Sequence, residues 1–215
     1  MRNSGRNYRP IFVAGASGSG TSFLAVALGQ RFDCAGVIYE TNLQVSKRSV
    51  LYVPPIDVFE SVASYQHAMG PHESWSVEAG RRDLLDLYRS YGSGRSDVVI
   101  DKGPDINLLR AGFLHRCFPD GRFLLVFRDP VTNVEGLRRK WPTFAHDPLA
   151  ESIRFYAEIH ERFLRETEAF PDRVIAVEYE SLVEHHEETL LAIGRRLGLA
   201  PARRQRRLRP AANVE

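Results

Sequence analysis

Residues 15–22 read GASGSGTS and combine three glycines with four hydroxyl-bearing side chains. Between a strand and a helix, such a stretch can bind a phosphate. Its backbone N–H groups converge on the anion, the helix N-terminus adds about half a positive charge, and glycine allows close approach. Ser19, Thr21 and Ser22 add hydroxyl donors. The sequence therefore predicts an anion site here, with a plain connecting turn as the alternative.

The same stretch matches the nucleotide-kinase loop G-x-x-x-x-G-K-[ST] except that Thr21 stands in the lysine position. That lysine normally contacts the β- and γ-phosphates of a nucleoside triphosphate. Its absence favours a ligand without a γ-phosphate. A small-molecule kinase remains an alternative, with Asp101 as the residue that could hold magnesium.

Other polar residues follow apolar segments that are predicted to be strands. In an open parallel sheet, ligands bind beyond the carboxyl ends of the strands, so these side chains are expected along one edge. A glutamate there can act as a general base, and an arginine or lysine can bind phosphate or stabilise developing charge. The residues in question are Glu40, Asp101, Lys102, Arg128 and Tyr179.

Apolar runs rich in Val, Ile and Phe alternate with segments of helical period along the chain. This alternation predicts a single α/β domain with a central parallel sheet between two helical layers. The expected strands are 11–14, 37–39, 98–100, 123–127 and 174–177. The expected helices are 21–31, 55–67, 77–91, 106–117, 131–140, 149–170 and 187–197. In the sixth of these helices, a stripe of Leu149, Ile153, Tyr156 and Phe163 is expected to face the core.

The composition is that of an ordinary globular protein. The chain has 215 residues, of which 43% are hydrophobic and 26% charged, which argues against disorder and against a membrane bundle. The apolar runs are shorter than the roughly 20 residues needed to span a bilayer. The first ten residues lack a signal-peptide core, so a cytoplasmic protein is expected. Cys34 and Cys117 are then expected to be reduced, buried thiols.

The formal net charge is only +2, but five arginines gather near the C-terminus. Such a run could bind a polyanion, or it could be a solvated tail. The sequence contains no zinc-ligand spacing and no aromatic and basic platform, so no nucleic-acid partner is expected. We expect an N-terminal extension at 1–10, an α/β domain at 11–200 and a basic tail at 201–215. The clustered residues are Arg203, Arg204, Arg206, Arg207 and Arg209.

Four ordered segments together resemble the sulfotransferases that use 3′-phosphoadenosine 5′-phosphosulfate (PAPS), especially the bacterial and tyrosyl-protein branch. Residues 11–25, IFVAGASGSGTSFLA, are similar to that branch's loop pattern G-x-P-R-S-G-T-[TS]-x-L. Residues 101–104, DKGP, resemble its acidic-Lys-x-Pro element. Residues 117–130, CFPDGRFLLVFRDP, and 174–183, VIAVEYESLV, resemble its R-[DN]-P strand and its Y-E-x-L element. The resemblance covers nearly the whole chain.

The resemblance implies a P-loop-like fold and in-line transfer of a sulfuryl group from PAPS, without a metal. The acceptor would be a hydroxyl or amine of a small molecule, glycan or peptide. It implies that Glu40, in an E-T pair, is the general base and that Lys102 faces the transferred group. Seven histidines offer an alternative base, because other branches use one: His67, His72, His115, His146, His160, His185 and His186.

The resemblance also implies which residues bind the nucleotide. Arg128 matches the arginine that binds the 3′-phosphate. Lys140 matches a second basic position, which its neighbours Arg138 and Arg139 could also occupy. Tyr179 matches the nucleotide-contacting tyrosine of the Y-E-x-L element. The 5′-phosphosulfate would lie on five loop residues: Gly18, Ser19, Gly20, Thr21 and Ser22.

Two positions depart from the family pattern. Gly18 replaces the usual Arg or Lys of the loop, and Gly136 replaces the serine eight residues after the phosphate-binding arginine. Losing a charge-assisted hydrogen bond to phosphate costs on the order of 1.5 to 3 kcal/mol, and losing a neutral one roughly 1 kcal/mol. Lys47, Arg48 or the basic tail could compensate. A catalytically inactive nucleotide-binding relative is therefore a further alternative.

Overall fold

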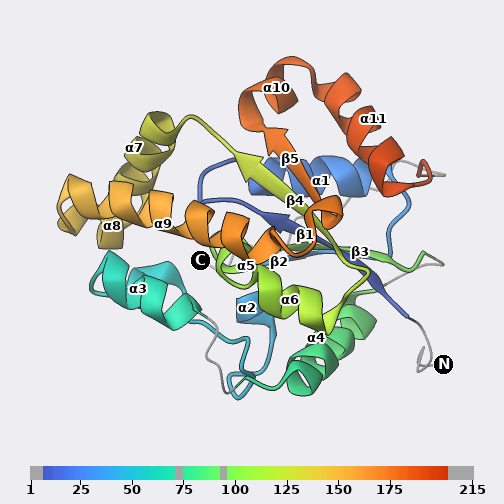
Figure 1. Cartoon of the computed structure of the whole chain (residues 1–215), viewed down its shortest axis with the longest axis horizontal. Helices are drawn as coiled ribbons and strands as arrows, with labels where there is room; N and C mark the ends of the chain where they lie inside the picture. Colours follow the sequence, from blue (N-terminus) through green and yellow to red (C-terminus); the bar gives the residue numbers. More distant parts are fainter. Residues whose placement is uncertain (1–6, 71–74, 93–95, 203–215) are drawn as a thin grey trace.

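A computed structural model describes residues 7–70, 75–92 and 96–202 of the chain, and its centre is a five-stranded sheet (Figure 1). All adjacent strands pair in parallel. The strand order β2-β3-β1-β4-β5 places β1 at the centre, with β3 and β2 on one side of it and β4 and β5 on the other. The strands are β1 (Arg9–Ala14), β2 (Gly36–Tyr39), β3 (Val98–Lys102), β4 (Arg122–Phe127) and β5 (Val174–Glu178).

Helices cover both faces of the sheet (Figure 1), which confirms the predicted α/β fold. Four helices match the expected spans closely. They are α1 (Thr21–Arg31), α4 (Val77–Tyr91), α7 (Pro130–Lys140) and α11 (His186–Leu197). The remaining longer ones are α3 (Val62–Met69), α6 (Ala111–Cys117) and α9 (Leu149–Thr167). Short helices complete the described chain: α2 (Thr41–Gln44), α5 (Ile106–Leu109), α8 (Pro142–His146), α10 (Tyr179–Glu184), η1 (Ile56–Val58) and η2 (Pro171–Arg173).

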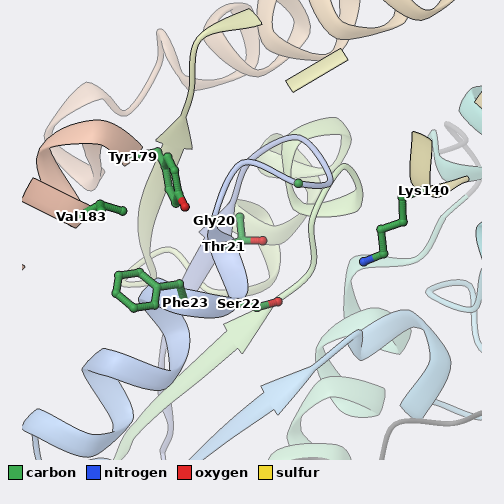
Figure 2. Close-up of a pocket in the computed structure, with 8 residues that line it drawn as sticks. Gly20, Thr21, Ser22, Phe23, Lys140, Tyr179 and Val183 are labelled. Carbon is green, nitrogen blue, oxygen red and sulfur yellow. The ribbon is translucent and has the colours of Figure 1, made fainter. Parts of the chain in front are cut away.

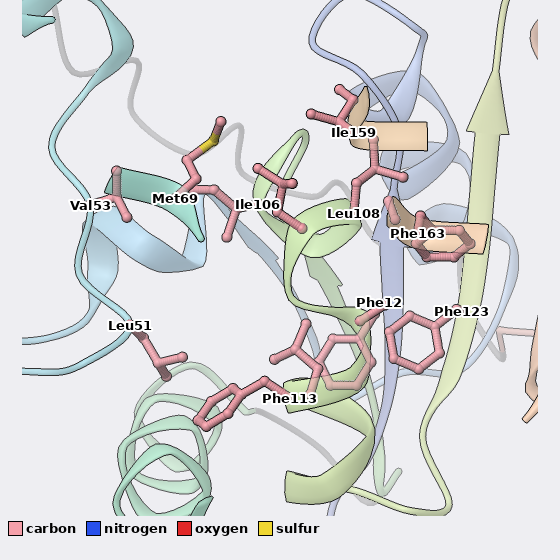
Figure 3. Close-up of a cluster of buried hydrophobic side chains, with 14 of the residues drawn as sticks. Phe12, Leu51, Val53, Met69, Ile106, Leu108, Phe113, Phe123, Ile159 and Phe163 are labelled. Carbon is pink, nitrogen blue, oxygen red and sulfur yellow. The ribbon is translucent and has the colours of Figure 1, made fainter. Parts of the chain in front are cut away.

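Each face of the sheet contributes to a hydrophobic core. On one face, Phe12 of β1 stacks on Phe123 of β4 at 5.0 Å between ring centroids, and Phe163 of α9 covers Phe123 (Figure 3). On the other face, Leu28 of α1 and Ile193 of α11 pack with buried strand residues. Because residues on both faces of the central strands β1 and β4 are buried, these two strands read as continuous apolar runs in the sequence.

The expected core stripe of α9 is wrong for two of its four residues. Leu149 and Ile153 are each 53% exposed, Tyr156 is half-buried, and only Phe163 is fully buried. The buried face instead carries Ser152, Phe155, Ile159, Phe163 and Thr167. This helix has apolar residues over a wide arc. Packing with the aromatic core selects the ridge of Phe155, Ile159 and Phe163, which are spaced four residues apart.

The expected helix at 106–117 is two helices, α5 and α6, because the chain breaks at Arg110. Arg110 is only 1% exposed. Its Nε donates to the carbonyl of Met69 at 2.8 Å, and a terminal nitrogen donates to that of Leu51 at 2.9 Å. The residue thus fixes the segment between β2 and α4 against the core, and the guanidinium stacks on Trp75 at 4.6 Å. The expected helix at 55–67 is likewise divided, into η1 and α3.

Several expectations concern the chain ends and the cysteines. Cys34 and Cys117 are buried and unbridged, as expected. The clustered arginines at 203–209 and His72 lie outside the described residues, so the basic tail and the domain limits stay predictions. Within the described ranges, no helix is both long enough and apolar enough to cross a bilayer.

Candidate active site

The glycine-rich stretch joins β1 to α1 as a loop open to an anion. Gly18 and Gly20 have φ of +84° and +97°, a left-handed backbone that glycine adopts without strain. The N–H of Ser19 donates to the carbonyl of Ala16 at 2.9 Å and closes the loop. No side chain caps the N-terminus of α1. The unpaired N–H groups of its first turn can therefore receive an anion.

A pocket of about 510 Å³ opens over this loop (Figure 2). Six of the eight residues predicted to bind the cofactor line it: Gly18, Gly20, Thr21, Ser22, Lys140 and Tyr179. Phe23 and Val183 complete the lining and were not predicted. In Figure 2, Tyr179 and Val183 lie on one side of the start of α1, and Lys140 lies on the other.

The two remaining predicted cofactor residues lie beside the pocket. Ser19 is fully buried within the loop, and its hydroxyl has no partner among the described residues. Arg128 is half-buried and donates to the carbonyl of Gly18 at 3.2 Å. Its guanidinium lies 4.6 Å from the ring centroid of Tyr179, and that ring in turn packs on the backbone of Gly20, where a Cβ would collide with it. Arg128, Tyr179 and Gly20 therefore form one stack at the loop.

The structure distinguishes Lys140 from its basic neighbours. Arg138 donates to the carbonyls of Phe144 and Asp147, both at 2.7 Å, and thus fixes the connection after α7. Arg139 is exposed and does not line the pocket, whereas Lys140 does. Lys47 and Arg48 are also exposed and outside the lining.

Glu40 and Lys102 form an ion pair at the carboxyl ends of β2 and β3. In the parallel register, Lys102 pairs with Tyr39 on one side and with Val13 on the other, two residues before the loop begins at Gly15. The Lys102 side chain is 6% exposed and that of Glu40 is 38% exposed. A buried ammonium thus has its counter-charge on a residue that solvent or a substrate can reach.

The backbone of Glu40 is unusual for a residue with a side chain. Its φ of +50° and ψ of +58° lie in the left-handed region, which costs a residue with a Cβ roughly 1 to 2 kcal/mol. The N–H of Glu40 donates to the carbonyl of Lys102 at 2.9 Å. The chain therefore leaves β2 and enters α2 with Glu40 held against Lys102. Strained residues of this kind concentrate at functional sites.

Asp101, the residue before Lys102, is buried, and both of its carboxylate oxygens accept hydrogen bonds. Its two carboxylate oxygens accept from the Thr41 hydroxyl at 2.5 Å and from the Tyr88 hydroxyl at 2.7 Å. Burial raises the pKa of Asp101, against the effect of these hydrogen bonds. This carboxylate does not reach the pocket and is not presented as a magnesium ligand. In the described ranges, no three His, Cys, Asp or Glu residues gather in a way that could hold a metal ion.

Two residues that contact the loop were not predicted from the sequence. Asp105, at 0% exposure, accepts hydrogen bonds from the Ser17 backbone and hydroxyl. Asn133, at 1% exposure, donates to the carbonyl of Ser17 at 3.3 Å. A carboxylate before the apolar run Ile106–Leu109 was a signal for Asp105. For Asn133, no local pattern distinguishes it from other polar residues of α7.

None of the histidines in the described ranges lines the pocket. His186 is near it, because its ring centroid lies 5.2 Å from that of the lining residue Phe23. His115 stacks on Phe170 at 3.8 Å between ring centroids, and burial lowers its pKa. The Nδ1 of His160 lies 2.7 Å from the carbonyl of Tyr156 within α9. Glu40 and Lys102 do not line the pocket either; they lie at the carboxyl ends of β2 and β3, next to the strand that leads into the loop.

A family model described as the Sulfotransferase family matches residues 10–202, most of the chain and all five strands. The chain belongs to the sulfotransferase family. The four motifs that carried the resemblance lie within the matched span. Among curated protein sequences, none matches this family member significantly.

Solved structures agree with this family at the level of the fold. The sulfotransferase STF9 from Mycobacterium avium superposes with a TM-score of 0.58 at 16% identity, covering 89% of this chain and 64% of that one. STF1 from Mycobacterium tuberculosis H37Rv gives 0.55 at 18% identity, covering 90% and 68%. Shikimate kinase from Bacteroides thetaiotaomicron gives 0.50 at 16% identity, covering 89% and 99%. The sulfotransferase-family chain thus shares its architecture with both sulfotransferases and a P-loop kinase.

Proposed function

We propose that this protein transfers the sulfuryl group of PAPS to a hydroxyl or amine, with Glu40 as general base. The observation that carries the proposal is the Glu40–Lys102 ion pair at the strand ends next to an uncapped, glycine-rich anion loop. In-line sulfuryl transfer needs a group that removes the acceptor proton and a cation that neutralises developing charge. One carboxylate and one ammonium in contact meet both needs.

In this proposal, the donor's 5′-phosphosulfate lies on Gly18–Ser22, where the free N–H groups of the first turn of α1 receive its charge. Arg128 binds the 3′-phosphate, a role that suits a planar, permanently charged fork. Its Nε is buried and has no hydrogen-bond partner among the described residues. Lys140 adds a second charge from α7, and Tyr179 contacts the nucleotide from the opposite side of the pocket.

The proposed roles of Glu40 and Lys102 follow from how far each side chain is exposed. Glu40 is partly accessible, so an acceptor hydroxyl can reach its carboxylate and give up a proton. Lys102 is buried and strand-bound, so its ammonium can turn from Glu40 toward the sulfonate and bridging oxygens as charge develops there.

A kinase is the second reading, and the same fold is found in a shikimate kinase. The loop nevertheless has Thr21 in place of the phosphate-binding lysine, and Asp101 is engaged with Thr41 and Tyr88. Both features disfavour magnesium ATP as the ligand. The third candidate function is a protein that binds the nucleotide without catalysing transfer. It differs from the first candidate only in lacking enzymatic activity.

The test compares 3′-phosphoadenosine 5′-phosphate (PAP) with magnesium ATP as stabilising ligands in thermal unfolding. PAP at 100 times its dissociation constant stabilises by about 2.7 kcal/mol. For a chain of this size, that raises the melting temperature by roughly 5 to 10 °C. Arg128→Ala is expected to weaken PAP binding about 10- to 100-fold, as loss of charge-assisted hydrogen bonds does.

Arg139→Ala is the matched control, because it removes an exposed arginine of α7 that does not line the pocket. It should bind PAP as the wild type does. Stabilisation by magnesium ATP but not by PAP would refute the proposal and favour the kinase. Sulfuryl transfer from labelled PAPS to a panel of hydroxyl and amine acceptors then separates the enzyme from an inactive binder.

A further inference from the structure

Asp105 is a buried carboxylate that touches the phosphate loop and helix α3 at once. One of its oxygens accepts from the backbone N–H of Ser17 at 2.7 Å. The other accepts from the Ser17 hydroxyl at 2.5 Å and from the Tyr65 hydroxyl at 3.0 Å. The N–H of Asp105 itself donates to the carbonyl of Gly15 at 2.8 Å. Asp105 is therefore bonded to two positions in the first half of the loop.

The backbone at Asp105 is strained. Its φ is +56° and its ψ is −50°, and the N–H of Ile106 donates to the carbonyl of Pro104 at 2.5 Å across it. This is a γ-turn of the positive-φ kind, which is rare and strained for a residue with a Cβ. Such a conformation persists only where surrounding contacts hold it, and it is found preferentially at functional sites. Here those contacts are the hydrogen bonds to Gly15, Ser17 and Tyr65.

The loop depends on these contacts at Ser17. The Ser17 carbonyl accepts from Asn133 of α7 at 3.3 Å, so the residue is held from two sides. The family pattern has proline at this position, and proline has no N–H to donate. The serine of this chain supplies two donors, and Asp105 accepts both. Ser17 directly precedes Gly18, whose carbonyl accepts from Arg128.

We propose that Asp105 is a positioning residue that holds the phosphate loop in its anion-binding shape, with Tyr65 bracing its carboxylate. The identity of the anion as the phosphosulfate of PAPS rests on the proposed function. Asp105 does not line the pocket, and its bonds go to the first half of the loop rather than to residues 18–22. Its effect on a ligand is therefore exerted through Ser17.

Two measurements test this inference: PAP affinity by calorimetry, and amide hydrogen exchange of residues 17–20 without nucleotide. Asp105→Ala removes the carboxylate oxygens that accept hydrogen bonds from Ser17 and Tyr65. We expect PAP affinity to fall about tenfold and exchange of the loop amides to rise by a similar factor. Ser17→Ala keeps the backbone bond and removes only the hydroxyl, so a smaller change in the same direction is expected even if Asp105→Ala folds poorly.

Asp105→Asn is the rescue variant. Its carboxamide oxygen can accept from the Ser17 N–H, and its NH₂ can donate to the two hydroxyls, which rotate to accept. PAP affinity is expected to stay within about threefold of wild type. Tyr88→Phe is the matched control, because Tyr88 donates to the neighbouring buried Asp101 in the same way and does not touch the loop. It should leave PAP affinity and loop exchange unchanged.

The inference would be overturned if Asp105→Ala kept both the loop-amide protection and the PAP affinity of the wild type. Equal losses in Asp105→Ala and Tyr88→Phe would also overturn it, because these would report general destabilisation of the core. The exchange measurement needs no nucleotide and separates the two proposals. If the wild type fails to bind PAP while Asp105→Ala still frees the loop amides, the proposed function fails and the positioning role of Asp105 stands.

Discussion

The contribution of Asp105 to folding stability should fall as the pH rises from about 4 to 7, and Asp105→Asn should remove that contribution. Burial raises the pKa of Asp105 from 3.8 to about 6, although Ser17 and Tyr65 hydrogen bonds oppose the shift. Between these two values the native state binds more protons than the unfolded chain. The free energy of unfolding therefore decreases with rising pH in this window.

The size of the effect follows from the pKa difference. A shift of about 2.2 pH units corresponds to about 3 kcal/mol in total, of which about 2 kcal/mol is lost between about pH 4.5 and pH 7. Below about pH 4 the neutral carboxyl contributes its full stabilising effect. Above about pH 7 the buried, ionised carboxylate has lost it.

Urea unfolding of wild type and Asp105→Asn at several pH values measures this contribution. The asparagine variant does not titrate, so its pH profile should be flatter by about 2 kcal/mol over this range. Asp101 is retained in both proteins, and its raised pKa contributes to both profiles. Asp86→Asn makes the same substitution on the exposed side of α4, and its pH profile of stability should match that of the wild type. Parallel profiles for wild type and Asp105→Asn would refute the reasoning.

Two further predictions concern the proposed reaction and its donor. Glu40→Gln should lower sulfuryl transfer from labelled PAPS about 100-fold or more while PAP affinity stays near wild type, since general base catalysis contributes 10²- to 10⁴-fold; unchanged turnover would exclude Glu40 as base. Gly136→Ser should tighten PAP binding about fivefold by restoring one neutral hydrogen bond. Its Cβ would meet no atom within 4 Å, and it lies between Asn133 and Lys140 on α7; calorimetry showing no gain would place the 3′-phosphate elsewhere.

The sequence was sufficient for the fold and for the position of the glycine-rich loop because both depend on short-range patterns. The strand cores at 11–14 and 123–127 are continuous apolar runs, and burial on both faces demands that composition. The loop needs glycine at positions 18 and 20 because the backbone there has positive φ. These requirements are local, so they can be read from neighbouring residues.

The helix faces and breaks were less predictable. For α9 the apolar arc is wide enough to allow two burial faces, and contacts with the aromatic core decide between them. The break between α5 and α6 depends on Arg110 bonding to carbonyls 41 and 59 residues earlier in the chain. The short helices α2, α8 and α10 contain four to six residues and carry too little periodicity to detect.

By itself, the sequence determined the parallel sheet, the glycine-rich loop between β1 and α1, and the strand-end position of Glu40, Lys102 and Arg128. Only the tertiary structure decided how those residues meet. Glu40 reaches Lys102 across 62 residues of chain, and Asp105 reaches Ser17 across 88. Such contacts depend on strand order, register and left-handed backbone at particular residues, none of which a local pattern specifies.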